Sequence, residues 1–301
     1  MNLSRSLHIV RCLLGSMLVF AVSGCKTIDP TEVTNFATSV TAVKTQTGDA
    51  LNATAGLTRD ASINYAASQP KLKEANFVET PTGDTISEWQ DAFSAIEAYA
   101  QNLSALLSPD ASKNFDVAAT NLFNQFNQTA GRLKANSINS QAGVNTLLAT
   151  AFTETANLII KARQETKAVE IAGITDTNIA SICALFAREI GADRVTSPGL
   201  RRTVYEAVWT PRLSALTEPF LETNSVGKLA ISQEYADMLA KRDAQDQILA
   251  SLRRSILALS AAHHKLAQGK PASIQSDLTI ISGEIQHTRE LYAQFSSLTK
   301  K

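Results

Sequence analysis

The stretch QDQILASLRRSILALSAAHHKL, residues 245–266, decides the predicted fold of this chain. Its apolar side chains return every three or four residues, which is the spacing of one face of an α-helix. The same heptad stripe begins near Ile231 and includes Tyr235, Met238, Leu249, Leu252, Ile256, Leu259, His263 and Leu266. The stripe predicts a helix of about 40 residues, which would be about 60 Å long at 1.5 Å per residue.

A second long helix is expected to pair with the first in the opposite direction. Gly269-Lys270-Pro271 predicts a tight turn, because glycine and proline both interrupt helices. The stripe then resumes with Ile274, Leu278, Ile281 and Ile285. Two periodic segments joined by a short connection predict an antiparallel helical hairpin, here at about 226–298.

The first part of the chain repeats this arrangement. Asp29-Pro30-Thr31-Glu32 has the residue types of a helix start, and the predicted helix continues to about Gln69. Thr85-Ile86-Ser87-Glu88 is a capping box that opens the next helix. A turn at Ser108-Pro109-Asp110 then predicts a hairpin at about 85–135.

The middle of the chain is less regular. A helix is expected at about 140–172 and is predicted to end at Gly173, and a shorter one is expected at about 176–190, ending at Gly191. Residues 191–225 are predicted to be irregular. This segment contains Pro198, Pro211 and Pro219, and a proline removes an amide donor and crowds the preceding turn. The whole pattern predicts an all-α fold, an elongated antiparallel helical bundle built from long helical hairpins.

The N-terminus has the three parts of a secretory signal peptide. Arg5 and Arg11 form a basic leader, an apolar run covers residues 12–22, and small residues follow. The last four residues of this region, Val22-Ser23-Gly24-Cys25, resemble the lipobox of bacterial lipoproteins. The resemblance implies cleavage before Cys25, so that residues 1–24 are a leader and residues 25–301 form the helical bundle domain.

The same resemblance implies that Cys25 carries a diacylglycerol on its sulfur and a further acyl chain, such as palmitate, on its new amine. Several chains would hold the protein firmly, since each buried methylene contributes roughly 0.8 kcal/mol. In the lipoprotein pattern an Asp after the cysteine favours the inner membrane, whereas Lys26 stands here, so the periplasmic face of the outer membrane is expected. The alternative is an ordinary cleaved signal peptide and a soluble periplasmic protein. A transmembrane anchor is disfavoured because the apolar run is too short to span about 30 Å.

Charge and cysteine content exclude several classes of protein. The full chain has 28 basic and 28 acidic residues, and the leader contains two of the basic ones and none of the acidic ones, so the mature net charge is about −2. This balance does not suggest a nucleic-acid binder. After cleavage Cys183 is the one cysteine left in addition to the lipidated Cys25, so no intramolecular disulfide is expected. Its apolar neighbours indicate a small buried hydrophobe rather than a reactive thiol.

Few residues suggest chemistry. Glu284-Ile285-Gln286-His287 is an E-x-x-H sequence on a helix, but di-metal bundles need two such sequences. His263 and His287 are offset by about 15 Å along the final hairpin, so they are not expected to share a metal. His263 is interpreted as a hydrogen-bonded histidine at the edge of the core. No nucleophile elbow, phosphate loop or dinucleotide fingerprint occurs, so neither a cofactor nor an enzymatic activity is predicted.

Two groups of polar residues are candidate interaction sites. Arg242 and Gln245 interrupt the final stripe, which is typical of a polar layer that fixes register and also fits a notch for a partner. Arg201, Arg202 and Arg212 lie in the proline-containing segment, where they would be either solvated or able to bind a carboxylate or phosphate.

The expected function is therefore that of a lipid-anchored structural or interaction protein. Its partners would be the membrane, through the lipid on Cys25, and an envelope protein or the cell wall. The alternatives are a bundle that handles a small ligand or a metal, with Arg242, Gln245 and His263 as interior groups, and a membrane-remodelling or pore-forming protein.

Overall fold

The protein is described by a computed structural model that covers residues 30–67, 69–77, 79–106, 111–136, 142–163, 168–269 and 274–299. All regular secondary structure in these ranges is helical, which confirms the predicted fold class. The elements are α1 (Pro30–Ala67), η1 (Glu74–Asn76), α2 (Gly83–Leu106), α3 (Ala111–Asn136), α4 (Ala142–Arg163), α5 (Ala168–Ile190), α6 (Leu200–Val204), η2 (Tyr205–Trp209), α7 (Thr210–Ala215), α8 (Thr217–Glu222), α9 (Ser225–Ala267) and α10 (Ile274–Thr299).

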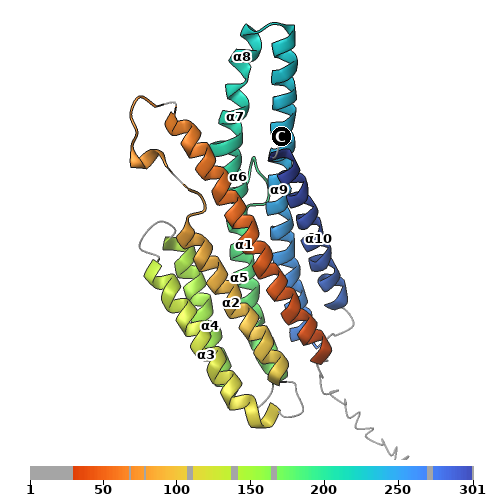
Figure 1. Cartoon of the computed structure of the whole chain (residues 1–301). Helices are drawn as coiled ribbons and strands as arrows, with labels where there is room; N and C mark the ends of the chain where they lie inside the picture. The colour runs from red at the N-terminus through yellow and green to blue at the C-terminus, as the bar shows by residue number, and fades with distance from the viewer. Residues whose placement is uncertain are drawn as a thin grey trace, which may run out of the picture.

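The long helices lie side by side and alternate in direction (Figure 1). Consecutive long helices are neighbours along the chain, α1 with α2, α2 with α3, α3 with α4, α4 with α5, and α9 with α10. α9 also packs against α5 and α1, so it joins the first and last parts of the chain. The two predicted hairpins correspond to α2–α3 and α9–α10, and the result is an elongated bundle.

The core is built from the stripes that the sequence predicts. Every apolar stripe residue in the first turns of α1 is fully buried, from Val33 and Phe36 to Val40 and Val43. In α9 the predicted stripe is buried from Leu249 to Leu266. Tyr235 and Met238 are not buried, contrary to the pattern, because the first part of α9 extends beyond the bundle.

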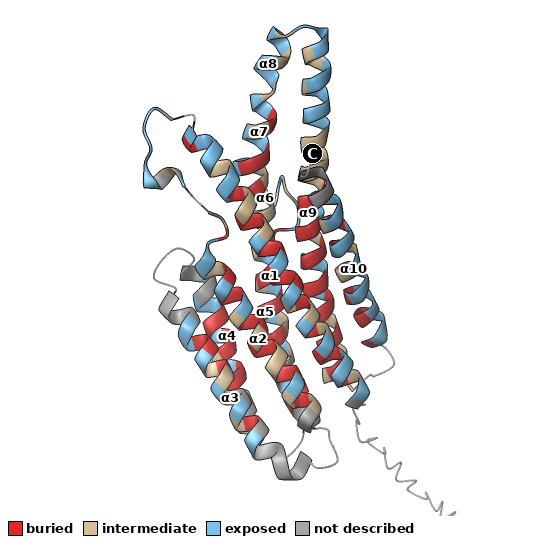
Figure 2. Cartoon of the chain, in the orientation of Figure 1, coloured by how far each residue is buried: buried red, intermediate tan, exposed pale blue. Residues whose placement is uncertain are grey.

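This extension is a projecting hairpin that we call the arm, residues 217–243, made of α8 and the first part of α9 (Figures 1 and 2). Asn224 begins α9, since its side chain accepts a hydrogen bond of 3.0 Å from the Gly227 amide. Within the arm no residue is fully buried, and burial of α9 begins at Ala244. The arm therefore stands out from the body at one end of the molecule.

The prediction for residues 140–190 was wrong at Gly173. The described helices are α4 and α5, and Gly173 lies inside α5 rather than at a helix end. Glycine in a helix costs about 1 kcal/mol relative to alanine. Burial of Ile171 and Ala172 before it and Ile179 after it outweighs that cost.

Gly191 ends α5 with φ +90°, as predicted. The chain then doubles back so closely that a Cβ on Gly199 (φ +135°) would lie 2.7 Å from the Gly191 nitrogen. Side chains are excluded at both positions, since only glycine tolerates these backbone angles and this separation.

The predicted irregular segment consists of short helical pieces. α6, the π-helical turn η2, α7 and α8 follow one another, and Pro211 and Pro219 lie in the first turns of α7 and α8. Proline is tolerated there because the first amides of a helix have no intrahelical acceptor. Together these pieces continue the line of α5 up to the arm (Figure 1).

Candidate functional site

The lipobox residues Val22, Ser23, Gly24 and Cys25 lie outside the described residues, so the structure does not bear on the predicted lipid site. Cys183 is fully buried in α5, and burial raises the pKa of its thiol to about 12. The thiol is therefore protonated and enclosed at neutral pH, as expected of a small buried hydrophobe.

Arg201 forms the best-defined ion pair at the base of the arm. Its Nε and Nη2 donate to the two carboxylate oxygens of Asp246 at 2.8 and 2.9 Å. The same guanidinium donates to the carbonyl of Ala192. These bonds use most of the donors of Arg201 within the protein and attach the loop after α5 to α9.

Arg242 belongs to the same group of charges. Its Nε and Nη2 both donate to Oδ1 of Asp243, which also accepts a bond of 2.6 Å from Arg194. Partial burial would raise the pKa of Asp243, but the hydrogen bonds from Arg194 and Arg242 outweigh it and hold the pKa below its ordinary value. We call Arg194, Arg201, Arg242, Asp243 and Asp246 the clamp.

The other two predicted interaction residues are not part of the clamp surface. Gln245 is buried, and its amide nitrogen lies 3.4 Å from the hydroxyl of Thr54 in α1, so it belongs to a polar layer between helices. Arg202 pairs with Glu206 one turn along the chain and is partly exposed. The structure therefore brings Arg201 and Arg242 together but separates them from Gln245 and Arg202.

A buried polar network connects α2, α5 and α9. His263 is fully buried, not at the core edge as the sequence suggested, and its Nε2 lies 2.8 Å from the hydroxyl of Tyr99. Its Nδ1 lies 3.1 Å from Asp176, and Tyr99 also lies 2.9 Å from the hydroxyl of Thr175. His264 approaches the second oxygen of Asp176 at 2.6 Å.

The Thr175 hydroxyl donates to the carbonyl of Ile171 at 2.7 Å, so its oxygen accepts from the hydroxyl of Tyr99, and the Tyr99 oxygen can in turn accept from Nε2 of His263. Burial raises the pKa of Tyr99 above its ordinary range. Burial alone would also raise the pKa of Asp176, but the hydrogen bonds from His263 and His264 outweigh it and lower the pKa. We interpret the network as structural because His263 has no exposed surface.

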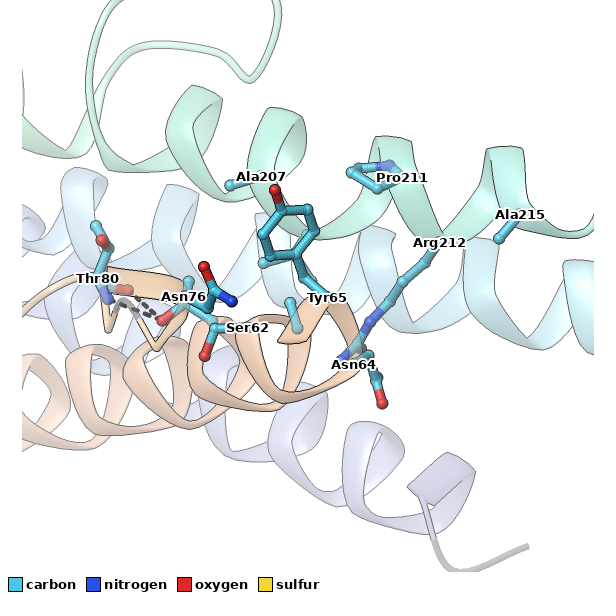
Figure 3. A pocket seen from close by; sticks show the side chains of 12 residues that line it. Ser62, Asn64, Tyr65, Asn76, Thr80, Ala207, Pro211, Arg212 and Ala215 are labelled. Carbon is cyan, nitrogen blue, oxygen red and sulfur yellow. Dashed lines mark hydrogen bonds between the residues drawn. The ribbon is translucent and has the colours of Figure 1, made fainter. Parts of the chain in front are cut away.

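A groove lies where the end of α1 faces η2 and α7 (Figure 3). It encloses about 470 Å³, within the range of roughly 300–1,000 Å³ that small-molecule sites occupy. In Figure 3 the side chain of Arg212 extends from α7 towards α1, where Asn64 lies, and the ring of Tyr65 points towards Ala207. Polar groups are also present at Ser62, Asn76 and Thr80.

Arg212 differs from the arginines of the clamp. Its Nε is buried and has no hydrogen-bond partner among the described residues. The guanidinium carbon lies 5.9 Å from the centre of the Trp209 ring, which fixes one face of the group. Burial lowers the pKa of Arg212, and the negative charge of Asp60 opposes that change. An arginine remains charged under these conditions.

The end of the arm exposes large apolar side chains. Leu221, Val226 and Leu229 are 70%, 79% and 61% exposed. Lower on the arm, Phe220 and Ile231 contribute to a recess between α8 and α9, and Lys228 lies 5.4 Å from the Phe220 ring. Single exposed apolar residues are common, but three at the end of one projection mark a candidate contact surface.

Comparisons with known protein families, with curated proteins and with solved structures found no match to this chain. The described residues contain no group of three or more His, Cys, Asp or Glu side chains placed to hold a metal. Among the helices of the described ranges, none has the length and apolar character needed to cross a membrane.

Proposed function

We propose that this protein is a lipid-anchored lipoprotein of the outer membrane, facing the periplasm, that acts by binding another component of the cell envelope and not by catalysis. The observation that carries the proposal is that the two ends of the molecule differ. α1 begins at the end of the bundle where α9 finishes, and the arm projects from the opposite end (Figure 1).

The dimensions fit a tethered protein that reaches away from a surface. Only four residues lie between Cys25 and Pro30, so the two are at most about 18 Å apart in an extended chain. α9 has 43 residues and is therefore about 64 Å long from the arm to the base. A lipid on Cys25 would hold the base near the bilayer and present the apolar end of the arm far from it.

The anchor is tested by replacing Cys25. The C25A variant is expected to lose all incorporation of labelled palmitate, and its N-terminal peptide is expected to lose the acyl mass in mass spectrometry, because no other group at the cleavage point can form the thioether. C183A is the control, since its thiol is buried in the bundle. Labelling of C25A at the wild-type level would contradict the anchor.

The contact surface is tested by placing a photoreactive amino acid at Leu229 in the arm and, as a control, at Leu72, which is more exposed than Leu229 and lies between α1 and α2. We expect a discrete cross-linked product in cells from position 229 and none from position 72. The change L229D is expected to reduce cross-linking from Val226 at least about fivefold, because a charge in an apolar contact is unfavourable. Equal products at positions 229 and 72, or none at either, would contradict a role for the arm.

A small-ligand role is favoured by one specific observation, the groove beside Arg212, and it would be a second property of the same protein. We do not propose metal handling or pore formation, because no observation on the described residues favours either.

A further inference from the structure

The groove between α1 and α7 is lined by apolar side chains and by one charged side chain. The apolar part of its wall comes from side chains that offer no hydrogen bonds: Ala61, Ala207, Val208, Pro211 and Ala215. The charge comes from Arg212, whose side chain crosses the groove from α7 towards α1 (Figure 3). A molecule that fills this space would bury apolar surface and meet one cation.

Arg212 has an unused donor in this position. A buried N–H without an acceptor is costly, and buried donors in folded proteins are nearly always paired with protein or water. The Nε of Arg212 is such a donor within the part of the chain that is described. Because the Nε is enclosed, an anion in the groove would meet the terminal nitrogens of the guanidinium, and it would offset the partial desolvation of that group.

The surroundings favour a single negative charge. The charge of Asp60 on α1 acts on Arg212 and offsets part of its positive field, which limits the negative charge that a ligand can bring. A carboxylate adds one charge to this environment, whereas a phosphate monoester would add nearly two and would be repelled more strongly by Asp60.

We propose that the groove binds a small amphiphilic carboxylate, with its apolar body against α1, η2 and α7 and its carboxylate on the guanidinium of Arg212. Trp209 packs beside the guanidinium and so limits its movement. This inference does not depend on the anchor or on the arm, because the groove lies in the body of the bundle.

Calorimetric titration of the purified mature protein with decanoate tests the proposal. Decanol and decyl phosphate serve as probes of the same apolar length that lack the charge or double it. We expect saturable binding of decanoate at one site, and binding of each comparison probe at least about tenfold weaker, as expected when a charged hydrogen bond is lost or a second charge is repelled.

Two variants with matched controls assign the site. R212Q should weaken decanoate binding at least about tenfold, whereas R289Q, an exposed arginine on α10, should leave it within about twofold. A207W should block the groove while Arg212 itself is kept. A236W, which adds the same side chain at an exposed position on the arm, is its control. Circular dichroism and thermal unfolding show whether each variant retains the wild-type fold.

The proposal is overturned if decanoate shows no saturable binding up to about 1 mM. It is also overturned if decanol binds as tightly as decanoate, or if R212Q and A207W, both folded, bind like the wild type. Tighter binding of decyl phosphate than of decanoate would overturn the assignment of a carboxylate.

Discussion

Replacing Phe186 by alanine is expected to lower the free energy of unfolding by about 3–5 kcal/mol. Phe186 is fully buried on α5, and its ring lies between two aromatic rings of α2. The ring centres are 4.8 Å from Phe93, in a stacked arrangement, and 4.6 Å from Trp89. Alanine would remove both contacts and leave a cavity that these large, rigid neighbours cannot fill.

Urea denaturation of F186A and of F77A measures this effect. Phe77 is the matched control because it is 48% exposed in the connection between α1 and α2, and its loss should change stability by no more than about 0.5 kcal/mol. A cost below about 1 kcal/mol for F186A would contradict the packing of α5 against α2.

The second large effect is expected from His263. H263A should also cost about 3–5 kcal/mol, because it leaves a cavity in the core and removes one hydrogen-bond partner each from Tyr99 and Asp176. The hydroxyl of Tyr99 would lose its bond to the imidazole, and Asp176 would lose one of its two histidines. Y99F removes only the hydroxyl and should cost less, about 1–3 kcal/mol.

His264 provides a matched control on the same carboxylate. Its side chain is 56% exposed and lies 2.6 Å from Asp176, so H264A should cost less than about 1 kcal/mol. Equal losses for H263A and H264A would contradict the buried position of His263.

The effect of H263A should also depend on pH. Because the pKa of Asp176 is lower in the folded state than in the unfolded chain, its interactions stabilise the fold above the unfolded value of about 3.9 and are lost as the pH falls through the folded value. Urea denaturation at pH 7 and at pH 3 should therefore show a smaller difference between wild type and H263A at the lower pH.

The regular part of this fold could be predicted from the sequence because its information is local. The stripe from Leu249 to Leu266, the turn at Gly269 and the return at Ile274 determine a hairpin without reference to the rest of the chain. The start of α1 at Pro30 and the end of α5 at Gly191 depend likewise on a few adjacent residues.

Features that depend on distant contacts were not predictable in this way. Gly173 has the residue type of a helix end, but packing on both sides of it keeps α5 continuous. Tyr99 and His263 are 164 residues apart, and nothing in either local pattern indicates that they form a hydrogen bond. The arm was also missed, since the heptad pattern continues at Tyr235 and Met238, although only the short helix α8 packs beside this part of α9 and neither side chain is buried.

The candidate sites show the same division. The sequence singled out Arg201, Arg202, Arg212, Arg242 and Gln245 as polar residues in unusual positions. Only the structure distinguishes Arg201, whose donors are satisfied by Asp246 and Ala192, from Arg212, whose Nε is not. What separates the two arginines is whether each guanidinium has hydrogen-bond acceptors. Those acceptors lie on other segments, which meet the arginines only in the folded chain.

The continuity of α9 has a mechanical consequence. The clamp holds this helix at Asp243 and Asp246, so a sideways pull on the arm acts on a lever whose fulcrum is a set of ion pairs. The two sides of the lever are comparable, about 27 Å from Ser225 to Asp243 and about 36 Å from there to Ala267. A force on the tip would therefore act on the part of α9 that is packed inside the bundle.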